Sequence, residues 1–356
     1  MNQPKFKGRG AQTNPKNRFN RFSIDNSNPG YDLNIDENYL EVQPRTVFYR
    51  DESKSVISKN DSEDLFFDYS FNPYRGCEHG CIYCYARPSH EFLGFSEGLD
   101  FETKIMIKEN APELLEEQFN KKSYKPDVIL FCGNTDPYQP IERRLGITRK
   151  SLQVCLDYRN PVSVITKNAL VLRDKDILTE MAGLNLVSVM ISIATLDKEL
   201  ANKMEPRTSI PERRLRIIEE LAKNGVPAGV NIAPVIPGLT DKEIPLILKR
   251  AAESGAKIAG YILLRLPYSV KDLFSDWLKN ELPGQANKIL NSIKSTRNGK
   301  LNESEFGKRF TGEGELADTI HELFRLNCKK FNLNSERIRL TNKLFRRNPG
   351  NQLALF

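Results

Sequence analysis

Long apolar runs are absent from this sequence of 356 residues, of which 39% are hydrophobic. None approaches the roughly 20 residues that a membrane-spanning helix needs, and the first ten residues contain no apolar segment of the secretory kind. Cysteine is also scarce, and three of the six, Cys132, Cys155 and Cys328, lack the spacing of a disulfide framework. We therefore expect a cytoplasmic protein in a reducing compartment, without membrane contact. No internal repeat is visible.

Acidic residues are nearly missing from both ends of the chain, although the net charge is only +7. Residues 1–22 contain lysines and arginines but no acid, and the five basic residues from Arg337 to Arg347 are opposed only by Glu336. Basic terminal arms suit phosphate binding, because neutralised phosphates release their counterions. The alternative is a solvated tail without a partner. The charge pattern is therefore compatible with nucleic acid but does not establish it.

Half of the cysteines lie within eight residues, as Cys77, Cys81 and Cys84. One tight loop with this spacing brings three thiolates to the corners of one iron–sulfur cube. No further CxxC pair lies nearby, so a [4Fe-4S] cluster here keeps one iron without a protein ligand, which is typical of a reactive site. The alternative is a zinc loop with His79 or His90 as fourth ligand, although zinc sites usually pair two ligand couples a dozen or more residues apart.

The wider string from residue 72 to 90, NPYRGCEHGCIYCYARPSH, resembles the radical S-adenosylmethionine (SAM) superfamily, in the branch that includes spore photoproduct lyase and its uncharacterised bacterial relatives. The resemblance implies that the free iron chelates the amino and carboxylate groups of SAM. One electron then breaks the S–C5′ bond and leaves a 5′-deoxyadenosyl radical that abstracts a substrate hydrogen. It also implies that Tyr83 packs near the adenine, and that a flavodoxin-like or ferredoxin-like electron donor is a partner.

Strand-like apolar runs alternate with helical segments after the cysteine loop, which predicts a parallel sheet with crossover helices. The expected strands are 68–72, 128–132, 162–166, 187–193, 229–235 and 261–264. Their continuous Val, Ile and Leu runs suit a sheet buried on both faces. The fold class is thus α/β, a partial (β/α)6 TIM-like barrel, which is also the fold of the superfamily that the chain resembles.

The barrel is expected to be one of five parts of a monomeric chain. These are a disordered basic tail over 1–30, an N-terminal extension over 31–67, the barrel over 68–270, a helical segment over 271–333 and a basic, then apolar tail over 334–356. The first and last parts are rich in polar residues and in breakers of regular structure.

Ligands of parallel β/α folds gather at the carboxyl ends of the strands, so the residues there are candidate site residues. The resemblance implies that Thr135 and Asp136 contact SAM where other members use Gly-Gly-Glu, a motif absent here. Lys167 and Arg207 are expected to pair with the SAM carboxylate, and Ser192 to face the ribose hydroxyls or that carboxylate. The alternative for each is a polar group that caps the following turn or helix.

Three further features lie at the ends of later strands or beside the second one. Val235, Ile236 and Gly238 resemble the segment that lies along the adenine. Cys132 closes the second strand and is a candidate hydrogen donor to a substrate radical, with burial as a small apolar side chain as the alternative. Arg265 stands in an apolar run and requires an anion or a wet cavity. That anion is either a phosphate or carboxylate of the substrate or a carboxylate of the chain.

The last five residues, Gln352 to Phe356 (QLALF), follow a stretch rich in helix breakers. They resemble the short peptide by which bacterial DNA polymerases and repair proteins dock on the sliding clamp. The alternative is a tail that folds back on its own barrel.

These observations predict a radical SAM enzyme that acts on nucleic acid, with DNA as a partner and repair of a lesion as the reaction. Two alternatives remain open: a radical SAM enzyme for tRNA, a peptide or a small metabolite, and a non-catalytic iron–sulfur redox or adaptor protein. Fold and cofactor do not fix the substrate. The polar residues at the strand ends favour an enzyme over an adaptor.

Overall fold

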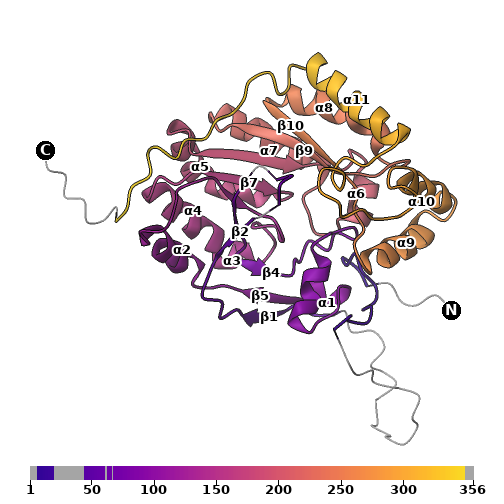
Figure 1. Cartoon of the computed structure of the whole chain (residues 1–356), viewed down its shortest axis with the longest axis horizontal. Coiled ribbons are helices and arrows are strands. Elements are labelled where there is room, and N and C mark those ends of the chain that lie inside the picture. Colours follow the sequence, from indigo (N-terminus) through magenta and orange to yellow (C-terminus); the bar gives the residue numbers. More distant parts are fainter. Residues whose placement is uncertain (1–5, 20–43, 61, 66, 349–356) are drawn as a thin grey trace, which may run out of the picture.

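The computed structural model of the chain describes residues 6–19, 44–60, 62–65 and 67–348. Its centre is a seven-stranded sheet of order β10-β9-β8-β7-β6-β3-β2 with helices packed around it (Figure 1). The strands in chain order are β2 (Ile57–Lys59), β3 (Tyr69–Phe71), β6 (Ile129–Phe131), β7 (Val162–Thr166), β8 (Val187–Ser192), β9 (Ala228–Val235) and β10 (Ile258–Leu263). All neighbours are parallel except β2 and β3, so the expected six parallel strands of a partial barrel are confirmed.

The strands form where the sequence is apolar enough to be buried on both sides. Every residue of β6 is buried, and β8 contains only one that is not. The first residues pair across the sheet, Ile129 with Val162 and Val162 with Val187. Because the strands are parallel and begin together, their carboxyl ends meet at one edge, where ligands of such folds bind.

The helices between the strands cover the outside of the sheet (Figure 1). They are α2 (Ala111–Asn120), α3 (Glu142–Leu145), α4 (Ile147–Asp157), η3 (Ala169–Asp174), α5 (Lys175–Gly183), α6 (Lys198–Met204), α7 (Pro211–Lys223), η4 (Asp241–Glu243) and α8 (Ile244–Glu253). Gly225 and Gly255, with φ of 74° and 90°, follow α7 and α8 in the left-handed conformation that commonly terminates helices.

A second, three-stranded sheet of order β1-β5-β4 carries the cysteine loop. Its strands are β1 (Val47–Arg50), β4 (Tyr74–Arg75) and β5 (Lys104–Ile107), and the helices η2 (Arg87–Leu93) and α1 (Leu99–Thr103) lie between β4 and β5 in the chain. The loop runs from β4 to η2, so both of its ends belong to regular structure. This sheet thus fixes the loop next to β3, the first strand of the barrel.

The N-terminal strap (residues 6–19) packs against this small sheet. The backbone nitrogens of Gly10 and Ala11 donate to the Glu102 carboxylate over 3.0 and 2.8 Å, and Arg9 donates to the Glu102 carbonyl over 2.9 Å. Ala11 is fully buried. The expected disorder over 1–30 is therefore wrong for residues 6–19, because a buried carboxylate supplies partners for a segment with little apolar side-chain area of its own.

The C-terminal part adds three helices and a second strap. The helices are α9 (Val270–Glu281), α10 (Ala286–Ser295) and α11 (Glu315–Lys330). The C-terminal strap (residues 341–347) then crosses the amino-terminal edge of the sheet (Figure 1), where the nitrogens of Thr341 and Arg346 donate to the carbonyls of Asn185 and Tyr158. The expected clamp-binding residues Gln352 to Phe356 lie outside the described part of the chain.

Part of the terminal basic charge has a structural role. Arg346 donates through Nε to the Asp157 carbonyl over 2.7 Å, and Arg347 donates to the Tyr124 carbonyl over 3.2 Å. Arg346 thus places a cation at the carboxyl end of α4, where the helix dipole favours it. These hydrogen bonds hold both arginines against the barrel. In the ranges that the structure describes, no helix combines the length and apolar character of a bilayer crossing.

Candidate active site

The three clustered cysteines lie on the loop between β4 and η2. Cys77 and Cys81 are buried, and Cys84 is partly exposed. The turn depends on Gly80, which has a φ of 67°; a Cβ there would lie 2.7 Å from Oε2 of Glu102. A side chain at this position would meet both backbone strain and a clash, so glycine is required where the loop bends between its cysteines.

The donor set fits a cluster that binds each thiolate through a different iron. Burial raises the pKa of all three thiols, and the neighbouring thiolates add to the effect at Cys77, so thiolates here need a metal to offset their charge. Among the residues that the structure describes, no three Cys, His, Asp or Glu side chains converge closely enough to hold one metal ion. A [4Fe-4S] cluster does not require such convergence, whereas a single zinc ion does.

The two histidines considered as zinc ligands have other surroundings. His79 lies 3.0 Å from Nδ2 of Asn168 and 3.4 Å from Oδ2 of Asp136. His90 packs between Phe95 and Phe101, with ring centroids 5.5 Å away in each case. Burial lowers the pKa of both imidazoles to about 4. Both are therefore neutral at pH 7, but among the described residues neither imidazole converges with the cysteines on a site for a single metal ion.

Asp136 joins the ends of β6 and β7. Its carboxylate accepts from the backbone nitrogens of Tyr138 and Lys167 and from Oγ1 of Thr166, over 2.7–2.8 Å. Its neighbour Thr135 is buried and donates through Oγ1 to the Tyr74 carbonyl. The structure thus places both predicted SAM contacts beside the cysteine loop but with partners inside the chain. Their contact with SAM stays a prediction.

Lys167 points into a buried charged cluster around Glu205. Its Nζ donates to Glu205 over 2.9 Å and lies 5.6 Å from the centroid of the Tyr83 ring. Tyr83 and Arg214 also donate to Glu205. Burial, with Arg214 as the next cause, lowers the pKa of Lys167 to about 8. Sequence analysis did not predict this role of Glu205, because a single acid gives no periodic signal.

The other two predicted polar contacts lie on different sides of this cluster. Ser192 is buried at the end of β8, and its carbonyl accepts from Nη1 of Arg214 over 2.9 Å. Arg207 reaches the N-terminal strap, donating to the Gly8 carbonyl over 3.1 Å, and lies 3.6 Å from Glu78. Arg207 therefore links the strap to the cysteine loop, a role that the sequence did not indicate.

The predicted adenine segment is only partly brought to the cysteine loop. Ile236 belongs to the same buried apolar cluster as Cys81 and Tyr83, whereas Val235 belongs to the main core. Gly238 has a φ of 79°, and a Cβ there would lie 2.7 Å from the hydroxyl of a serine on α10. Gly238 is thus explained by its turn and its contact with α10.

Cys132 follows β6 and faces the cysteine loop. Burial raises the pKa of its thiol to about 12, and the charges of Asp136 and Cys84 contribute. Its φ of 148° is unusual for a residue with a side chain. Next to it, the Gly133 carbonyl accepts from the hydroxyl of Tyr85. The thiol is partly exposed, and its role as a hydrogen donor stays a prediction.

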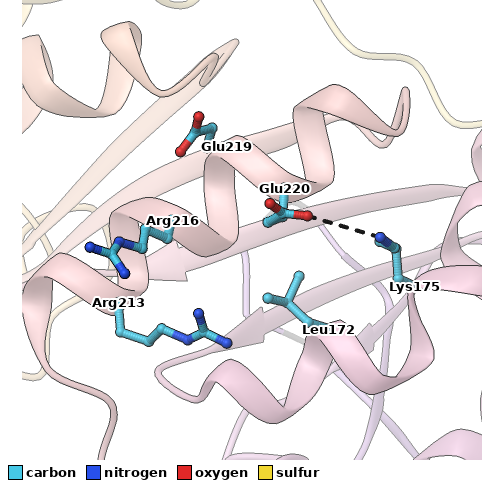
Figure 2. A pocket seen from close by; sticks show the side chains of 6 residues that line it. All are labelled: Leu172, Lys175, Arg213, Arg216, Glu219 and Glu220. Carbon is cyan, nitrogen blue, oxygen red and sulfur yellow. Dashed lines mark ion pairs between the residues drawn. The ribbon is translucent and has the colours of Figure 1, made fainter.

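A pocket on the outside of the barrel is separate from this site. It has a volume of about 350 Å³ and lies between α7 and the segment of η3 and α5, as Figure 2 shows. Its lining consists of Leu172, Lys175, Arg213, Arg216, Glu219 and Glu220. Lys175 and Glu220 form an ion pair across it at 3.9 Å. None of its residues is a predicted site residue.

Comparisons with known proteins agree with this geometry. An uncharacterized protein of Mycobacterium tuberculosis (strain ATCC 25618 / H37Rv) is 35% identical over 233 residues, which cover 65% of this chain and 68% of the relative. An uncharacterized protein of Methanocaldococcus jannaschii is 32% identical over 175 residues, which cover 49% and 63% of the two chains. These relatives give no activity by name.

Among solved structures, spore photoproduct lyase complexed with dinucleoside spore photoproduct has a TM-score of 0.58 and 18% identity, over 80% of this chain and 79% of that chain. A variant of the same enzyme with bound AdoMet gives a TM-score of 0.59 and 17% identity over the same shares. At this level of identity the match shows a common fold. The family model "Radical SAM superfamily" covers residues 71–251, from the last residue of β3 through the cysteine loop to α8. This chain therefore belongs to the radical SAM superfamily, whose cofactors are a [4Fe-4S] cluster and S-adenosylmethionine.

Proposed function

We propose that this protein is an enzyme in which Cys77, Cys81 and Cys84 hold a [4Fe-4S] cluster for the reductive cleavage of SAM. The observation that carries the proposal is the set of three thiols on one glycine-dependent loop at the carboxyl edge of a parallel sheet. When bound, the cluster and SAM supply a 5′-deoxyadenosyl radical that removes hydrogen from the substrate. An electron donor such as a flavodoxin or ferredoxin is then required.

The residues around the loop have roles in binding and in the exclusion of water. Lys167 keeps most of its charge at pH 7, since its pKa is about 8, and offers that charge to the SAM carboxylate. Tyr83 and Ile236 form an apolar wall for the adenine. The remaining proposed contacts to SAM are Thr135, Asp136, Ser192, Arg207, Val235 and Gly238.

We further propose that the substrate is nucleic acid and that the reaction resembles the repair of a DNA lesion. In solved complexes, spore photoproduct lyase holds a dinucleoside spore photoproduct, and this chain has the same fold. Cys132, next to the cysteine loop, is the proposed hydrogen donor to the substrate radical. The other candidate substrates, tRNA, a peptide or a small metabolite, become outcomes of the same test.

The test is anaerobic reconstitution of the cluster, followed by addition of dithionite and SAM. We expect 5′-deoxyadenosine from the wild-type protein and none from a variant in which all three cysteines are replaced by alanine. A panel of lesion-bearing DNA duplexes in the same assay then tests the substrate. Absence of 5′-deoxyadenosine from a protein with a full complement of iron would contradict the proposal and favour a redox or adaptor role.

Docking on a DNA sliding clamp through Gln352 to Phe356 and a monomeric state in the cytoplasm complete the proposal. The reducing cytoplasm suits an oxygen-sensitive cluster and free cysteines. The clamp test is a titration of purified clamp with the peptide 346–356 and with its Leu355→Ala, Phe356→Ala version. Equal binding by the two peptides, or none by either, would remove this partner.

A further inference from the structure

Arg265, two residues beyond the sixth parallel strand, forms no ion pair with a carboxylate in the part of the chain that the structure describes: Asp64, the one carboxylate that acts on its charge, is already paired with Arg309. Arg265 is partly buried, and its Nε is buried without a hydrogen-bond partner in the part of the chain that the structure describes. Burial lowers the pKa of its guanidinium, and the neighbouring Arg309 lowers it further. Desolvation of an unpaired cation is costly unless an anion compensates for it.

The surroundings of Arg265 are positive and aromatic. Its guanidinium lies 5.6 Å from the centroid of the Tyr85 ring and 5.1 Å from that of Phe310. Arg309 forms hydrogen bonds to Asp64, so this second cation has its counterion. The nearby Arg297 is buried and donates to backbone carbonyls at the end of β10. These three arginines therefore have one paired carboxylate among them, and that carboxylate belongs to Arg309.

This arginine borders the proposed reaction centre. Tyr85, which lies under the Arg265 guanidinium, is the residue after the third cysteine, and its hydroxyl donates to the Gly133 carbonyl next to Cys132. Tyr85 and Phe306 are about half exposed, at 48% and 52%, and Phe306 lies against Arg309, 4.7 Å from its guanidinium. Arg265 beside Tyr85 and Arg309 beside Phe306 are two neighbouring cations next to exposed rings. This is the combination that binds single-stranded nucleic acid, with phosphate on a cation and bases on the rings.

We propose that Arg265 binds a phosphodiester group of the nucleic-acid substrate, and that Tyr85 and Phe306 offer ring faces to the adjoining bases. The proposal rests on the nucleic-acid substrate proposed above and adds a position for its backbone. The planar guanidinium suits a phosphate because it donates two parallel hydrogen bonds. Because Asp64 balances the charge of Arg309, the net positive charge of the site comes from Arg265 and the nearby Arg297.

The experiment measures binding of a fluorescein-labelled single-stranded oligodeoxynucleotide to the full, anaerobically reconstituted chain by fluorescence anisotropy. The salt concentration is varied over roughly 50–200 mM. The variants are Arg265→Gln, Arg265→Lys and, as a matched control, Arg250→Gln on the exposed face of α8, where Arg250 pairs with Glu212. Iron content and circular dichroism establish that each variant is folded, and 5′-deoxyadenosine formation by the wild type is measured in parallel.

We expect Arg265→Gln to bind about tenfold more weakly and to lower the slope of log K against log salt by about 0.7, the value for one phosphate contact on a single strand. Arg265→Lys should retain the slope and lose part of the affinity, because lysine lacks the fork. Arg250→Gln should bind like the wild type.

The outcomes separate this inference from the proposed function. A folded Arg265→Gln variant with wild-type affinity and slope would overturn the inference and leave SAM cleavage untouched. A wild type that forms 5′-deoxyadenosine but binds no oligonucleotide would overturn both the nucleic-acid substrate and the inference. A wild type that binds through Arg265 but forms no 5′-deoxyadenosine would support the inference and contradict the proposed chemistry.

Discussion

The two sides of the barrel mouth treat charged groups in opposite ways. Around the cysteine loop, Asp136, Lys167 and Glu205 each have partners within the chain. At the end of β10, Arg265 contacts two aromatic rings but has no ion pair among the described residues, and its buried Nε has no hydrogen-bond partner there. Charged groups that are paired with one another within the chain, here called the closed network, keep their geometry before any ligand binds. An unpaired cation instead binds an anionic group of the ligand. The first side is thus suited to a cofactor that is always the same, and the second to a substrate.

The largest effect should come from the cysteine side. We expect Cys77→Ala to lose the iron–sulfur absorption near ~400 nm and all 5′-deoxyadenosine formation, because two thiolates cannot retain the cluster. Cys328→Ala, a change to a buried cysteine of α11, is the control and should keep both signals. Retention of a full cluster by Cys77→Ala would show that Cys77 is not one of its ligands and would contradict the proposed site.

The closed network itself is tested by Glu205→Gln. Removing the carboxylate leaves Arg214 and Lys167 buried without their anion, which should lower the free energy of unfolding by about 3–5 kcal/mol. The measurement is urea denaturation of the reconstituted protein under anaerobic conditions. Glu219→Gln removes an exposed carboxylate paired with Lys223 and should leave the midpoint unchanged. Equal urea midpoints for the two variants would show that the buried network around Glu205 contributes no more stability than an exposed ion pair.

The N-terminal strap belongs to the closed side, and Gly10→Ala tests its contact. A Cβ at position 10 would lie 1.8 Å from the Gly80 carbonyl oxygen, so the strap must leave the loop. We expect a loss of about 2–3 kcal/mol, the value of its two hydrogen bonds to the Glu102 carboxylate, and faster tryptic cleavage within residues 6–19. Gly284→Ala, where a Cβ meets nothing within 4 Å, is the control. An unchanged rate of tryptic cleavage would show that the strap stays bound without its contact at Gly10.

Glu97 lies on the same side as the cysteine loop, but its carboxylate is not paired with a cation in the part of the chain that the structure describes. Its substitution gives the smallest expected effect. Its side chain is buried, and its carboxylate lies beside Ser269 and Glu91 without a hydrogen bond of ordinary geometry in the described ranges. Burial, and then the charge of Glu91, raise its pKa from 4.5 to about 7. Ionisation of Glu97 thus opposes folding, with no cost below pH 4.5 and the full cost above pH 7.

The test is the difference in free energy of unfolding between Glu97→Gln and the wild type. It should rise by about 2 kcal/mol from pH 5 to pH 8, since each pKa unit corresponds to about 1.4 kcal/mol and solvent screening removes part of the full value. A difference that stays constant with pH would show that Glu97 is solvated in the folded protein.

The sequence predicted the parts of this molecule that repeat or lie close together along the chain. The strand expected over 162–166 is β7 itself, because β-branched residues, which favour strands, fill four of these five positions. The cysteine motif lies within eight residues, so its spacing was enough to predict a cluster site. The partners of Glu102 and Glu205 were not predicted, since Gly10 and Tyr83 lie 92 and 122 positions away from them. Pairs of single polar residues at such separations leave no pattern in one sequence.

The C-terminal strap covers aromatic side chains that are synthesised much earlier than the strap itself. Arg346 hydrogen-bonds to Asp157, 189 positions earlier, and the Phe345 ring covers Phe119 and Tyr124, with centroids 5.8 and 5.7 Å away. At ribosomal rates of about 5–20 residues per second, Phe345 is synthesised roughly 10–40 s after Phe119 and Tyr124. The nascent barrel therefore exposes an aromatic patch at its amino-terminal edge until residue 345 has been synthesised and has reached it, and a chaperone that binds such patches has that interval in which to act.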